Sequence, residues 1–131
     1  MAESVRAHHP GAQVLVLVVD GAQHAGTDEP FTPLSPADLG VDAREVARRA
    51  ALYTPQELIS SLKPLLMRHL VTRHGTPAVL LDADCLVLGD LAALTEPATR
   101  HAVVLTPHRS VPAAHTPGGY GPEQDFLRSG V

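Results

Sequence analysis

The sequence predicts an α/β domain with a mostly parallel sheet. Three apolar runs, at residues 14–19, 78–82 and 102–105, are rich in Val, Leu and Ala and show no alternation with polar residues. Such runs are typical of strands that a parallel sheet buries on both faces. Stretches with helical spacing lie between the first run and the second. We therefore expect a three-layer sandwich, with helices covering a sheet.

The composition bounds the class of protein. The chain has 131 residues, 44% of them hydrophobic and 18% charged, which predicts one globular domain. Its formal net charge of −4 argues against a nucleic-acid partner, which needs a basic surface. The sequence has neither a signal-peptide pattern nor an apolar run of the roughly 20 residues that span a membrane. With Cys85 as its only cysteine, the chain is predicted to be cytoplasmic.

Two helices are expected in the first half of the chain. Residues 2–9 favour a short helix that ends at Pro10 and Gly11. Ser35 followed by Pro36 is a helix-start signal, and a helix is expected over residues 42–53. Its spacing predicts an inward face of Val46, Ala50 and Tyr53 and an outward face of Arg44, Arg48 and Arg49.

A longer helix follows directly. Thr54 and Glu57 form the pattern of a capping box, with Pro55 at the first helical position. Pro64 lies inside the predicted helix and is expected to kink it, since proline removes one backbone hydrogen bond. The residues with helical spacing are Leu58, Ile59, Leu62, Leu65, Leu66, His69 and Leu70.

The segment 78–91, AVLLDADCLVLGDL, contains the sharpest chemical feature of the sequence. Asp82 and Asp84 follow a predicted buried strand, and on an extended backbone two side chains at this spacing point to the same side. Ligands of open α/β sheets bind beyond the carboxyl ends of strands. Two carboxylates at such a place are suited to hold Mg²⁺ or Mn²⁺ together with phosphate oxygens. The neighbouring Cys85 is interpreted as a small apolar filler rather than a reactive thiol.

The apolar strand, D-x-D, apolar triplet and Gly-Asp of this segment resemble the D-x-D region of GT-A glycosyltransferases. The similarity is greatest to bacterial enzymes related to the glycogenin-like and lipopolysaccharide galactosyltransferase group. Segments 62–66, 105–108 and 123–127 also look like parts of that pattern. The resemblance implies a partial GT-A, Rossmann-like sandwich. It also implies a nucleotide-diphosphate sugar donor, such as a UDP-sugar, bound through Mn²⁺ or Mg²⁺ at Asp82 and Asp84.

The resemblance further implies that residues 1–131 form a single, incomplete donor-binding domain. GT-A domains usually begin with a strand that helps to hold the base, and this sequence begins in what looks like the following helix. Such proteins also continue beyond the equivalent of Val131 into the acceptor side, where a third metal ligand is often a His. We therefore expect the isolated chain to lack transfer activity, and its acceptor and catalytic residues are not assigned.

Lys63 is the one lysine beside nine arginines. A lysine retained against that bias indicates a compact point charge, as in a contact with a pyrophosphate. In related glycosyltransferases, a Lys at a similar place upstream of the D-x-D touches the donor. A donor contact and a solvated surface position are equally favoured for Lys63 by the sequence.

Other candidates rank below these three residues. His108, just past a predicted strand end, is the strongest of the eight histidines. His69 is interpreted as a half-buried helix residue, Tyr53 as a core residue rather than a base-stacking one, and Glu123 as a loop or helix-start residue. A substrate contact for Asp125 is a hypothesis only.

Two alternative functions remain open. A HAD-type phosphatase uses the first Asp of a strand-end D-x-D as nucleophile, but its motif normally continues with Gly-Thr and sits at the first strand. Here Cys85 and Leu86 follow, and at least one strand and two helices are predicted upstream. The other alternative is a non-catalytic fragment that binds a nucleoside diphosphate.

Overall fold

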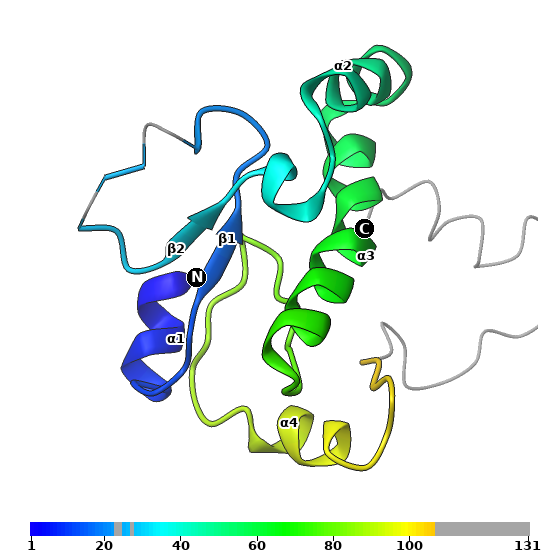
Figure 1. The fold of residues 1–131 in the computed structure, drawn as a ribbon. Coiled ribbons are helices and arrows are strands. Elements are labelled where there is room, and N and C mark those ends of the chain that lie inside the picture. The colour runs from blue at the N-terminus through cyan, green and yellow to red at the C-terminus, as the bar shows by residue number, and fades with distance from the viewer. Residues whose placement is uncertain (23–24, 27, 107–131) are drawn as a thin grey trace, which may run out of the picture.

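The computed structural model describes residues 1–22, 25–26 and 28–106, and within them the chain is an α/β protein with four α-helices (Figure 1). The two strands form one parallel sheet, and the parallel direction agrees with the sequence prediction. No helix in this part of the chain is long and apolar enough to cross a membrane. The elements in order are α1 (Ala2–His8), β1 (Leu15–Leu17), β2 (Thr32–Leu34), the 3-10 helix η2 (Pro36–Leu39), α2 (Ala43–Leu52), α3 (Pro55–His74) and α4 (Ala92–Ala98).

The sheet pairs β1 with a strand that the sequence did not predict. Val16 lies opposite Pro33, and backbone bonds extend the pairing at both ends, from Thr32 N–H to Val14 C=O and from Val18 N–H to Leu34 C=O. Pro33 has no N–H to donate, and a proline argues against a strand when only the sequence is considered. β1 itself is only half-buried, so the expectation of a strand covered on both faces is wrong.

The strands predicted at 78–82 and 102–105 are absent from the described structure. Both segments are non-helical chain without strand pairing. Several of their apolar side chains are exposed, including Leu80 at 41% and Leu105 at 83%. An apolar run supplies the side chains of a buried strand but not the partner that its backbone needs, and the described residues supply none.

The early helices follow their local signals with two corrections. α1 agrees with the prediction for residues 2–9. Ser35 caps the short η2, which ends at Gly40 with a φ of 78°, and Asp42 separately caps α2. Val46 is half-buried as predicted, because it packs against the larger hydrophobic cluster. Ala50 and Tyr53 are exposed, so the prediction that they face inward is wrong.

The long helix α3 organises the larger of two hydrophobic clusters. It begins at the predicted capping box, in which Thr54 and Glu57 bond reciprocally, runs through Pro64 as one helix, and ends at Gly75 with a φ of 64°. The α3 cluster consists of Leu39, Val41, Leu62 and Leu66, with half-buried side chains from β1, β2 and α2 packed around it. A separate α1 cluster consists of Ala2, Val5, Val14 and Val87.

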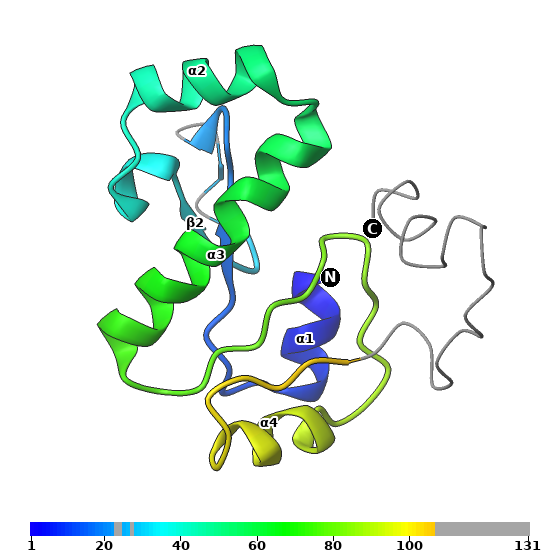
Figure 2. The same ribbon diagram turned by 90° about the vertical axis from the view of Figure 1, so that its right-hand side faces the viewer.

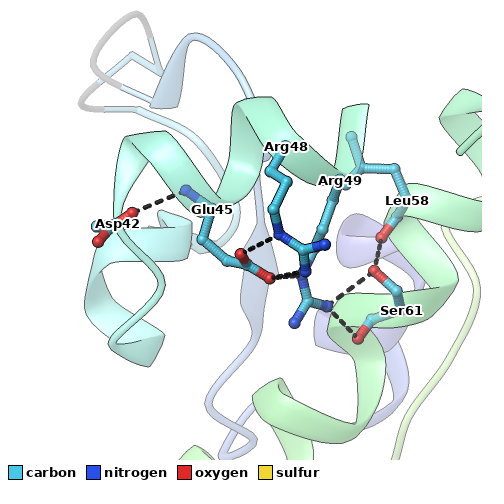
Figure 3. Close-up of polar contacts among 6 residues, drawn as sticks. All are labelled: Asp42, Glu45, Arg48, Arg49, Leu58 and Ser61. Carbon is cyan, nitrogen blue, oxygen red and sulfur yellow. Dashed lines mark hydrogen bonds and ion pairs between the residues drawn. The ribbon is translucent and has the colours of Figure 1, made fainter. Parts of the chain in front are cut away.

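A polar network joins α2 to α3 on the surface (Figure 3). Glu45 accepts hydrogen bonds from Arg48 at 2.7 and 2.8 Å and from Arg49 at 2.8 Å. Arg49 also donates to the Oγ and the carbonyl of Ser61 in α3. The hydrogen bonds from Arg48 and Arg49 lower the pKa of Glu45 to about 2. Arg49, which contacts Ser61 of α3, is half-buried. The prediction that it points outward is therefore wrong.

The α3 cluster is expected to dominate stability. Leu62 is fully buried, so Leu62→Ala leaves a cavity and should lower the free energy of unfolding by about 2–5 kcal/mol in urea denaturation. Leu52→Ala is the matched control, because that side chain is 67% exposed, and its effect should stay within about 0.5 kcal/mol. Equal losses for the two variants would contradict the assignment of the core.

The Glu45 network predicts a pH dependence. The pKa of Glu45 is lowered from 4.5 to about 2, so its contribution to stability is complete above about pH 4.5 and disappears as the pH falls through about 2. Glu45→Gln should lower the melting temperature at pH 7, and its difference from the parent should shrink on acidification. Glu96→Gln, on α4, should produce no such pH-dependent difference.

Candidate functional site

The D-x-D residues lie on a turn rather than on an extended strand end. The N–H of Cys85 donates to the carbonyl of Asp82 at 3.0 Å, and residues 83–84 form the centre of the turn. The prediction that Asp82 and Asp84 share one side of an extended backbone is therefore wrong for this structure. Both residues are exposed, so both carboxylates are accessible to a ligand.

The structure brings two of the three predicted site residues together. Nζ of Lys63, in the middle of α3, donates to Oδ1 of Asp82 at 2.5 Å across 19 positions of sequence. The side chains of Lys63 and Asp82 are 34% and 52% exposed, so the pair lies at the surface. Lys63 is thus not a purely solvated lysine, and its charge lies beside the first carboxylate of the D-x-D.

The chain on either side of the turn is held by α1. After α3 it runs past α1, turns and returns to α4 (Figures 1 and 2). Leu81 packs against the α1 cluster, and Val87 belongs to it. The N–H of Val87 donates to Ser4 Oγ at 3.0 Å, and the N–H of Leu91 donates to His9 Nε2 at 3.1 Å.

Ser4 and His9 therefore position the turn, and the sequence analysis missed both. Their partners lie 83 and 82 positions away, so no local spacing connects them to the D-x-D. His9 also lies 3.9 Å from Asp90, whose Oδ1 accepts the N–H of Ala92 at the start of α4.

Asp82 and Asp84 are the side chains of this turn that could hold a cation. The Asp84 side chain makes no hydrogen bond or ion pair with the residues described, whereas Asp82 is bound by Lys63. Within the described ranges, no group of three or more His, Cys, Asp or Glu side chains is placed to hold a metal ion. Mg²⁺ takes six oxygen ligands in an octahedral arrangement. Most ligands of such a cation at this turn would therefore have to be phosphate or water oxygens.

The lesser candidates have separate outcomes. His69 is half-buried on α3, as predicted. Cys85 is exposed, so its interpretation as a buried filler is wrong. Tyr53 is 44% exposed rather than a core residue. His108, Glu123 and Asp125 lie outside the described residues.

Comparisons of the chain with protein-family models, with curated proteins and with solved structures find no match.

The Lys63–Asp82 pair should contribute modestly to stability. Exposed ion pairs are worth about 0–1 kcal/mol, so a double-mutant cycle of Lys63→Met and Asp82→Asn should give a coupling free energy in this range in urea denaturation. The cycle of Lys63→Met with Asp84→Asn is the control and should give a smaller coupling. Equal couplings would contradict a specific pair at Asp82.

Proposed function

We propose that the chain is the donor-binding part of a metal-dependent glycosyltransferase with a partial GT-A fold. In this proposal Asp82 and Asp84 bind Mn²⁺ or Mg²⁺, and the cation and Lys63 bind the diphosphate of a nucleotide sugar. The observation that carries the proposal is the contact between Lys63 and Asp82. In this proposal Lys63 contacts the phosphates and Asp82 binds the metal ion, and the two side chains form an ion pair.

The charges favour a cation and a diphosphate together over either one alone. Two carboxylates and one ammonium leave a local charge of about −1, which repels a bare diphosphate. A cation alone gains two carboxylates but must displace Lys63 from Asp82. When both bind, the cation takes Asp82 and the diphosphate offers Lys63 a new partner. Binding of metal and nucleotide is therefore expected to be cooperative.

When bound, the cation would neutralise charge that develops on the leaving diphosphate. The chain itself supplies binding and orientation on the donor side. Lys63 fixes a positive charge at the phosphates, and the α1 contacts of Val87 and Leu91 hold the D-x-D turn in place. This arrangement orients a donor but includes no assigned group that activates an acceptor.

This geometry supports the phosphatase alternative less than it supports the glycosyltransferase proposal. It needs the first Asp of the motif as a nucleophile in line with a phosphorus atom, and here Lys63 occupies one carboxylate oxygen of that residue. The non-catalytic alternative shares the binding chemistry and differs only in transfer. An assay of sugar transfer separates the two, because transfer also requires an acceptor held in near-attack geometry.

Calorimetry of UDP with and without Mn²⁺ tests the proposal. UDP should bind in the presence of Mn²⁺, and chelator should weaken the binding by at least about tenfold, because the cation links diphosphate to carboxylates. Asp84→Asn should weaken it similarly. Glu96→Gln, an exposed carboxylate on α4, is the control and should bind as the parent does. UDP affinity that is indifferent to Mn²⁺ and to Asp84→Asn would contradict the proposal.

Lys63→Met separates a phosphate contact from a purely structural lysine. The variant should bind UDP in the presence of Mn²⁺ about tenfold more weakly, since it loses a charge-assisted hydrogen bond of about 1.4 kcal/mol. It should bind Mn²⁺ alone as well as or better than the parent, because Asp82 no longer has to leave an ammonium. A loss in both measurements would instead indicate that Lys63 only holds the turn in shape.

A further inference from the structure

A second charged region lies on α3, away from the D-x-D turn. A hollow of about 360 Å³ is lined by Leu39 of η2 and by Leu65, Arg68, His69, Thr72 and Arg73 of α3. The five α3 residues follow helical spacing, so they share one side of the helix over about 12 Å. The volume is at the lower end of the roughly 300–1,000 Å³ typical of small-molecule sites.

The floor of the hollow is apolar and continuous with the core. Leu39 belongs to the α3 cluster and is 7% exposed, and Leu65 packs against the same cluster. These side chains are held by packing, so the floor is present before any ligand arrives. An apolar floor of this kind stabilises a hydrocarbon group by removing its surface from water.

The rim is cationic. Arg68 and Arg73 are exposed, and neither makes an ion pair or a hydrogen bond through its side chain with the residues described. Asp38, next to Leu39 in the sequence, accepts hydrogen bonds from the N–H and the hydroxyl of Ser35 at 2.7 and 2.6 Å. The two guanidinium groups and the Asp38 carboxylate together leave a local charge of +1 in a chain whose formal charge is −4.

We propose that this hollow binds an amphipathic carboxylate, with its hydrocarbon body on Leu39 and Leu65 and its charged group between Arg68 and Arg73. The planar guanidinium groups match a carboxylate in two-point hydrogen bonding. One negative charge balances the local charge, and the apolar floor adds affinity that a small inorganic anion would not gain. This site is separate from the D-x-D turn and does not depend on the proposed function.

Titration of the whole chain with octanoate, followed by amide NMR shifts and calorimetry, tests the proposal. Octanoate should shift the amides of His69 and Thr72, whereas octanol and acetate, which each lack one half of the ligand, should bind at least about fivefold more weakly. Arg68→Ala and Arg73→Ala should each weaken octanoate binding by about fivefold or more. Higher salt should weaken it too, because the rim is exposed.

Arg44→Ala is the matched control, since Arg44 is an exposed arginine on α2 without a side-chain ion pair in the described part of the chain. It should change octanoate affinity by less than about twofold. Arg68→Lys retains the charge and should recover only part of the affinity. An equal loss in the Arg44 and Arg68 variants, equal binding of octanol or acetate, or no shifts at His69 and Thr72 would each overturn the proposal.

Discussion

The burial of Leu62 is the constraint on which the rest of this structure depends. Its side chain is fully enclosed by the α3 cluster, and this fixes the rotation of α3 about its own axis. Successive residues of an α-helix are about 100° apart. Lys63 is therefore turned away from the core and toward the chain that follows the helix, where it meets Asp82. The same rotation presents Arg68, Thr72 and Arg73 on a face beside η2.

One helix thus separates two kinds of electrostatic environment. Near the middle of α3, Lys63 neutralises one of the two carboxylates of Asp82 and Asp84, so a slight excess of negative charge remains. Toward its C-terminal end, two guanidinium groups exceed the neighbouring carboxylate of Asp38, which is engaged by Ser35. The first environment suits a cation together with an anion, and the second suits an anion alone. The D-x-D turn and the hollow beside η2 therefore suit ligands of different chemistry.

The D-x-D turn depends on weak contacts from distant parts of the chain. Ser4 and His9 accept part-buried hydrogen bonds from Val87 and Leu91, and Lys63 forms an ion pair at the surface. Each of these contacts is worth about 1 kcal/mol. The surrounding segment also leaves large apolar side chains in water, including Leu86 at 68% and Leu88 at 80%. A segment with few buried contacts opens more readily than the core. A ligand that joins Asp82, Asp84 and Lys63 would therefore stabilise this part of the chain more than the α3 cluster.

The sequence by itself determined the features that depend on residues three or four positions apart. The capping box of Thr54 and Glu57, the extent of α1 and the helical spacing of the α3 leucines could all be predicted, because each depends on residues about one helical turn apart. The tertiary structure decided which distant segments meet. It paired β1 with a strand containing Pro33, gave residues 78–82 no strand partner among the described residues, and placed Lys63 on Asp82. A strand partner or an ion pair is set by how the core packs, and local residue patterns do not specify that packing.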